Sequence, residues 1–310
     1  MPKLRTMYYR RATWLGAGPG HGDLQSLIDG IHRRLNTTAA RTFGYKDGEL
    51  QGVKIDGEGR PRCTLLHIAY YVPRQPTSLV PDPAPVANSD TVERNPPVHH
   101  SYMNGDVFAL LHGNDVILCN SGAREGAAKA YLAAVLVRGG VEDVFELEQV
   151  ADVNKVEMVQ REGVKSIRLA TSVYKATQDR LTRETKKTNF MGEIAEEFLR
   201  LYADRQGMGP DELAEYENLQ VKLEISFDSR RRGGVVAAEK LDAAANSLFA
   251  EDDAGFVITT KEGNTLTSED IKVKKSAEID DHGNSVACSR AWQAMLEYYR
   301  ELRESGVVEE

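Results

Sequence analysis

The chain has 310 residues, of which 39 are lysine or arginine and 47 are aspartate or glutamate, so its formal net charge is -8. This length allows two domains of medium size, each with its own core. A content of 41% hydrophobic and 28% charged residues is typical of folded proteins and excludes a disordered chain. The negative net charge opposes the general attraction to phosphate that many nucleic-acid-binding proteins use. Any binding to nucleic acid would therefore depend on local basic patches.

Neither a membrane span nor a metal site is expected. The longest apolar run begins at Ala130 and is too short to cross a bilayer. The basic N-terminal segment lacks the apolar stretch of a secretory signal, so we expect a cytoplasmic protein. Cys63, Cys119 and Cys288 are far apart and lack the cysteine or histidine spacing of a zinc site. We expect buried, reduced thiols, no metal and no cofactor.

The N-terminal third predicts a strand over residues 3–13, a helix over 23–35, and two strands over 50–56 and 63–72. The helix is amphipathic, with apolar residues at the spacing of one face, and Asp23 or Gly22 caps it. The apolar positions are Leu24, Leu27, Ile28, Ile31 and Leu35. Residues 73–97 then hold seven of the eleven prolines, which predicts a long loop or arm.

A β-hairpin is the clearest local prediction. Strands over residues 106–112 and 115–121 flank Gly113-Asn114, two residues that tolerate the positive φ of a tight hairpin turn. Ser121 is predicted to cap a helix over residues 124–138, whose alanines favour close packing on a sheet.

The remaining chain alternates helices and antiparallel strands without a regular strand-helix-strand rhythm, which favours an α+β fold. We expect two lobes of antiparallel sheet with packed helices, residues 1–140 with the proline-rich loop 73–97, and residues 141–310 with a long C-terminal helix. The pattern shifts at 141–151, and a short polar helix follows before 164. The other predicted elements of the second lobe are strands at 164–174, 219–228, 255–261 and 270–279, and helices at 190–205, 235–250 and from 285 to about 305.

No segment has the pattern of a catalytic or metal centre. The glycine-rich segment 16–22 lacks the lysine and spacing of a phosphate-binding loop and is interpreted as a turn. His99 and His100 are adjacent, and neighbouring side chains of a strand point to opposite faces, so we expect them to be structural or exposed. Glu224 alternates with apolar residues and should face solvent.

Hydrolase and nuclease patterns are also missing. The serines lack the G-x-S-x-G motif, and the only histidine expected near Cys119 is His112 on the paired strand. The carboxylates fall mainly on polar helix faces and in turns, which disfavours a metal-dependent nuclease. We therefore predict that the protein is not an enzyme.

Basic clusters remain as candidate contact surfaces. Three arginines precede Gly233-Gly234 between a predicted strand and a predicted helix, where they can reach phosphate oxygens. The candidate nucleic-acid-binding residues are Arg230, Arg231, Arg232, Lys186, Lys187, Lys272, Lys274 and Lys275.

The order of elements resembles that of the phage-exclusion RexA proteins and the related RdgC-like DNA-binding proteins. The resemblance covers the hairpin and helix at 106–136, the strands 164–174 and 219–228, and most closely the tail 255–279 with the long helix after it. It implies a two-lobed, often dimeric protein that binds double-stranded DNA without sequence preference in phage defence or recombination control. It implies no catalytic residue.

Three hypotheses follow. The first is a non-enzymatic, abortive-infection type of defence protein that binds nucleic acid, expected to be double-stranded DNA, and acts with a partner effector protein. The second is a protein-binding adaptor or sensor without DNA binding, which the negative charge and the proline-rich loop favour. The third is a metal-dependent nuclease.

Overall fold

The computed structural model describes residues 2–15, 22–83, 85, 88–123, 126–172, 220–226, 241–245, 255–282 and 285–308. The chain divides into two units, one of residues Met1–Glu148 with Lys274–Glu310 and one of residues Gln149–Val273. Both contain antiparallel sheets with helices, so the predicted α+β class is confirmed. No helix in the described part of the chain is long and apolar enough to span a membrane.

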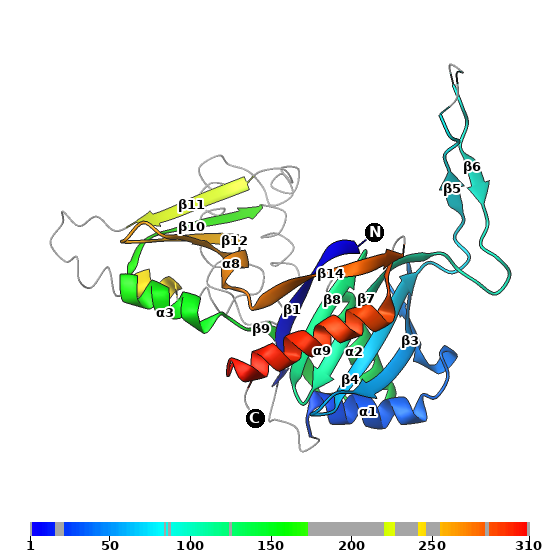
Figure 1. The fold of residues 1–310 in the computed structure, drawn as a ribbon, viewed down its shortest axis with the longest axis horizontal. Helices are drawn as coiled ribbons and strands as arrows, with labels where there is room; N and C mark the ends of the chain where they lie inside the picture. The colour runs from blue at the N-terminus through cyan, green and yellow to red at the C-terminus, as the bar shows by residue number, and fades with distance from the viewer. Residues whose placement is uncertain are drawn as a thin grey trace, which may run out of the picture. The chain divides into compact units, whose positions relative to one another are not determined.

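A nine-stranded sheet forms the centre of the first unit (Figure 1). Its strands follow the order β15-β14-β1-β8-β7-β4-β3-β2, neighbours along this order pair antiparallel, and β9 pairs with β1. The strands are β1 (Pro2–Leu15), β2 (Thr42–Tyr45), β3 (Gly48–Glu58), β4 (Cys63–Tyr71), β7 (Met103–His112), β8 (Asp115–Ser121), β9 (Val144–Gln149), β14 (Lys274–His282) and β15 (Ser285–Val286).

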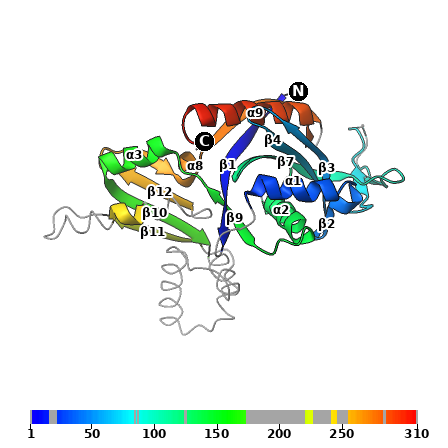
Figure 2. The same cartoon turned by 90° about the horizontal axis from the view of Figure 1, so that it is seen from below.

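Helices cover both faces of this sheet (Figure 2). Helices α1 (Leu24–Arg34) and α2 (Gly126–Arg138) pack on one face, where Val107 and Ala109 of β7 contribute to their core. Helix α9 (Cys288–Glu304) lies on the other face and buries Trp292 and Met295. Because both faces are covered, β7 is buried continuously from residue 105 to 111 and does not show the alternating pattern of a strand with one wet face.

Most of the predicted helix caps and turns in the first unit are confirmed. Asp23 caps α1, and its carboxylate accepts a hydrogen bond of 2.8 Å from the Ser26 backbone N–H. Gly113 has a φ of 57° in the turn between β7 and β8. The predicted cap Ser121 is wrong, because Ser121 is the last residue of β8 and α2 begins at Gly126. An isolated parallel bridge joins Gly122, the residue after Ser121, to Asp106 of β7.

The proline-rich segment forms an arm, as predicted, and the arm contains a short hairpin. Strands β5 (Thr77–Leu79) and β6 (Val92–Arg94) pair antiparallel in a two-stranded sheet of their own. Figure 1 shows them extending away from the nine-stranded sheet. We call residues 72–102 the arm.

The second unit has a four-stranded antiparallel sheet with the order β11-β10-β12-β13. Its strands are β10 (Val164–Ser172), β11 (Gln220–Ser226), β12 (Gly255–Thr260) and β13 (Thr265–Thr267), and its helices include α3 (Val153–Glu162) and the single turn α8 (Ser268–Ile271). Val159 of α3 and Ile258 of β12 belong to a core that also includes Leu241. The helix predicted at 190–205 lies outside the described residues.

The predicted division into residues 1–140 and 141–310 differs from the two units at the C-terminal end. Residues 274–310 belong to the first unit, because β14 pairs with β1 from Pro2 to Tyr8 and α9 packs on β7, β8 and β14. The strand predicted at 270–279 begins only at Lys274, since Thr267 and Asp270 form a capping box that starts α8 before it.

Candidate functional site

A cleft of about 800 Å³ lies at the base of the arm, and we call it the arm-base cleft. One wall comes from β3 and β4 of the large sheet and carries Glu49, Gln51, Ala69 and Tyr71. The opposite wall comes from the arm and carries Arg74 and residues 95–101. Its volume is in the range of protein sites that hold small molecules or short segments of a ligand.

Strand register explains why the four sheet residues share one face. Glu49 pairs directly with Tyr71, and Gln51 pairs with Ala69. Side chains of a strand alternate between faces, so the residues between them point the other way. Leu50, between Glu49 and Gln51, accordingly lies in the core beneath α1 and α2.

The sheet wall presents a phenol beside a carboxylate. Burial, and then the hydrogen bond with Glu49, raise the pKa of Tyr71 to about 12, while a hydrogen bond with Thr42 opposes this shift. Tyr71 therefore stays protonated at neutral pH and donates to Glu49. The Gln51 Nε2 lies 3.2 Å from Thr42 Oγ1 and 3.5 Å from the Tyr71 hydroxyl. This wall offers hydrogen-bond donors and one negative charge.

Two tight turns build the arm wall. In the first, the Gln75 N–H donates to the Val72 carbonyl at 3.2 Å, and Arg74 has a φ of 57°. In the second, the His100 N–H donates to the Pro97 carbonyl at 3.0 Å, and His99 has a φ of 65°. A positive φ at the third position alone defines a type II turn, in which that position is usually glycine or asparagine.

The two turns are linked to each other and keep their polar side chains exposed. The Arg74 N–H donates to Ser101 Oγ at 3.2 Å, just beyond the second turn. His100 Nδ1 lies 2.9 Å from the Val98 carbonyl, which fixes the proton on Nδ1. Arg74, His99 and His100 are all exposed. None of the ion pairs found among the described residues involves Arg74.

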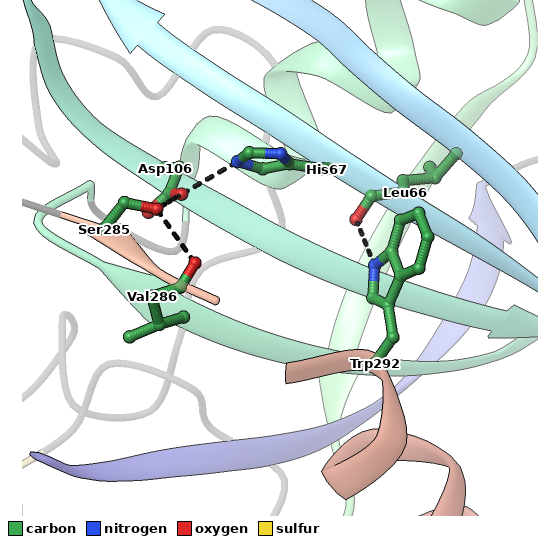
Figure 3. A network of polar contacts seen from close by, with 6 residues as sticks. All are labelled: Leu66, His67, Asp106, Ser285, Val286 and Trp292. Carbon is green, nitrogen blue, oxygen red and sulfur yellow. Dashed lines mark hydrogen bonds and ion pairs between the residues drawn. The ribbon is translucent and has the colours of Figure 1, made fainter. Parts of the chain in front are cut away.

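A buried polar network borders the cleft on the same sheet face. Asp106 on β7 pairs across the strands with Ala69 of the cleft wall. Its carboxylate is fully buried and accepts hydrogen bonds from His67 Nε2 at 2.8 Å and from the Ser285 hydroxyl (Figure 3). The His67 ring stacks on Phe108 with 4.5 Å between ring centroids.

This network joins the start of α9 to the sheet. Ser285 lies on β15, immediately before the helix, and Trp292 of α9 donates through Nε1 to the Leu66 carbonyl at 3.4 Å. The order of groups differs from a catalytic triad, because the serine bonds to the aspartate and has no bond to the histidine that would take its proton. We interpret the network as structural.

The predicted nucleic-acid-binding residues are only partly described. Lys186, Lys187 and Arg230, Arg231 and Arg232 lie outside the described residues. Lys272 belongs to the second unit and pairs with Glu269 at 2.5 Å, whereas Lys275 belongs to the first and contacts both Glu301 carboxylate oxygens at 2.6 and 2.7 Å. Lys274 is exposed on β14 and, as the strand neighbour of Lys275, faces the other side.

The structure also describes the histidine pair and the glutamate that the sequence singled out. His99 and His100 are exposed as predicted, but they lie in a turn and both line the cleft, since the chain there is not a strand. Within the described ranges, no group of three or more histidine, cysteine or acidic side chains could hold a metal ion. Glu224 is exposed as predicted and lies 3.5 Å from Arg168.

All three cysteines are free, and two of them are buried as predicted. Cys63 and Cys119 are buried, whereas Cys288, the first residue of α9, is half-buried. Burial raises the pKa of the Cys63 and Cys119 thiols to about 11, which keeps them protonated at neutral pH. The glycine-rich segment is outside the described residues from 16 to 21.

Sequence reasoning missed the cleft residues Glu49, Tyr71 and Arg74. A signal for Arg74 exists, because the order Val-Pro-Arg-Gln places proline at the second position of a type II turn. Glu49 and Tyr71 lie on strands that were predicted, but the cleft exists only because the arm folds back at its base. No local pattern contains that information.

No family model matches the chain, and no curated protein or solved structure matches it either.

Proposed function

We propose that the protein is a non-enzymatic adaptor or sensor that binds a partner protein through its arm and the arm-base cleft. The observation that carries this proposal is an apolar pair left uncovered on the arm. Leu79 and Val92 are opposite each other in the β5-β6 hairpin, and they are 44% and 59% exposed. Val80 and Val98 on the same arm are also exposed.

Strands β5 and β6 form a two-stranded sheet of their own. A two-stranded sheet without a covering layer is marginally stable in water. A partner that covers the exposed parts of Leu79 and Val92 removes apolar surface from water and stabilises the complex by about 1 kcal/mol for each residue. Among the described residues no third strand joins β5 and β6, so a partner strand can bind to either edge of the hairpin.

Capture of the partner from the native host's extract tests this proposal. The tagged full chain is compared with the double variant Leu79→Ser/Val92→Ser and with deletion of Thr77 to Asn95. Val137→Ser is the matched control, because Val137 is an apolar residue on α2 that is 68% exposed. We expect the wild type and the control to capture one partner that both arm variants lose. Equal capture by all four proteins would contradict the proposal.

DNA binding is the second candidate function, and the run Arg230 to Arg232 favours it. The resemblance of the element order to RexA and RdgC-like proteins also supports DNA binding, and it supports a role in phage defence for either candidate function. Because Lys275 already has a carboxylate partner, we expect DNA contact to depend on the arginines.

A gel-shift titration over salt concentration tests the DNA candidate. Binding to duplex DNA at low salt should weaken in Arg231→Ala/Arg232→Ala and stay unchanged in Lys275→Ala. Absence of a shifted band at low salt, or equal binding by the arginine variant, would exclude this version.

A further inference from the structure

Two polar residues occupy backbone positions that normally belong to glycine, and both line the arm-base cleft. Arg74 and His99 have positive φ values in their type II turns. A left-handed conformation costs a residue with a side chain about 1–2 kcal/mol. Among the described residues, the only other non-glycine residue with a positive φ is Lys46, between β2 and β3. There a two-residue hairpin turn itself requires that conformation.

Such strain persists at sites where the side chain has a role in binding. Glycine at either turn position would remove the strain and would also remove a polar side chain from the cleft. The Arg74 guanidinium has no ion pair among the described residues, and its exposure leaves its donors open to a ligand. A guanidinium binds a carboxylate through two parallel hydrogen bonds.

The two walls of the cleft carry opposite charge. Arg74 stands on the arm wall, while Glu49 stands on the sheet wall and accepts a hydrogen bond from Tyr71. A ligand that fits both walls has an anionic group toward the arm and a donor, such as an amide N–H or a basic side chain, toward Glu49. Phosphodiester chains carry a negative charge at every step and would bring further charges toward Glu49. The net charge of -8 adds to that repulsion.

We infer that the arm-base cleft binds a peptide segment through one of its carboxylates, which Arg74 and His99 hold against the arm wall. The inference rests on the proposed function and specifies the chemistry of the partner. Pro73, Pro96 and Pro97 line the same cleft and provide a rigid, apolar surface on which the peptide backbone and its neighbouring side chains pack.

Selection from a displayed library of random short peptides tests the inference on the full chain. The baits are the wild type, Arg74→Ala, the chain without Thr77 to Asn95, and Lys46→Ala as the matched control. Lys46 is an exposed basic residue with a φ of 53° that does not line the cleft. Selected peptides, and versions with their acidic residue changed to the amide, are then titrated by calorimetry.

We expect wild-type peptides to share an aspartate or glutamate at one position. Arg74→Ala and the amide peptides should each weaken binding about tenfold or more, as expected for a lost hydrogen bond between charged groups. Lys46→Ala should bind like the wild type. Arg74→Gly should lose binding as well without any loss of stability, because removal of the strained conformation offsets the greater freedom of the unfolded chain.

Different results would contradict the carboxylate contact and the proposed function. Peptides that need the arm but share no acidic position, or that bind Arg74→Ala equally, would overturn the carboxylate inference and leave the proposed function intact. Failure to select any peptide would contradict both. The deletion of Thr77 to Asn95 keeps Arg74 and His99 of the cleft. Peptides that bind this deletion equally but lose affinity for Arg74→Ala would therefore contradict the proposed role of the apolar arm pair and leave the carboxylate inference intact. Displacement of a bound peptide by oligothymidylate at the same concentration would show a nucleic-acid site and overturn the peptide assignment.

Discussion

His32 is a buried residue whose ionisation is coupled to folding. Its Nε2 lies 3.2 Å from the Tyr131 hydroxyl, between α1 and α2. Burial, and then the nearby Arg41 charge, lower the pKa of His32 from 6.5 to about 4. The unfolded chain therefore binds more protons than the folded chain between these two values, and stability is lost as the pH falls through this range.

We predict that the free energy of unfolding of the first unit falls by about 2 kcal/mol between pH 7 and pH 5 through this residue. Urea unfolding at the two pH values measures it. His32→Phe should remove most of this part of the pH dependence, whereas His100→Gln, an exposed control, should retain it. An unchanged pH dependence in His32→Phe would show that other groups are responsible.

Among the helices and strands, the sequence predicted the features that depend on residues close together in the chain. The hairpin 106–121 was found because Gly113-Asn114 suits its turn, and α1 because its apolar residues share a face and Asp23 caps it. Ser121 failed as a cap, because it is the last residue of β8, which pairs with β7. The cleft was not predicted, since its walls are brought together by the base of the arm, although the prolines indicated the arm.

The attachment of helix α9 to the sheet can be tested by substitution of Ser285. The Ser285 hydroxyl donates to the buried Asp106 carboxylate, whose Oδ1 has no hydrogen-bond partner among the residues that the structure describes. Ser285→Ala leaves the carboxylate with His67 alone, so we expect the free energy of unfolding to fall by about 1–3 kcal/mol. Hydrogen exchange should become faster in β15 and the first turns of α9.

Ser276→Ala is the matched control, because its hydroxyl contacts Thr6 at 3.2 Å at an exposed position. It should change stability by less than about 0.5 kcal/mol. Equal effects of the two serine substitutions would mean that the Asp106 network does not hold the helix.

At the scale of the whole molecule, the first unit is completed by the end of the chain. Strand β14 joins β1 across more than 260 residues of sequence, as in the pair of Leu4 and Glu278. Periodicity predicts each strand but not its distant partner, which is why residues 274–310 were assigned to the wrong lobe. The second unit is thus an insertion between β9 and β14.

The two ends of this insertion meet. The Val273 N–H donates to the Val150 carbonyl at 3.1 Å, and Ala151 forms a bridge with Lys272. We therefore predict that a short glycine-serine linker can replace residues 149–273 and leave the first unit folded. Two-dimensional amide spectra should retain the dispersed signals of the nine-stranded sheet. A chain that ends at Val273 should instead lose them, because β14 and α9 are missing.

Partner capture by the full chain with and without the apolar arm pair tests whether the arm is the binding surface. We expect Leu79→Ser/Val92→Ser to abolish capture of the partner and Val137→Ser to retain it, with equal stability of both variants in urea. Retention of the partner by the stable double variant would contradict the claim that the arm is the binding surface.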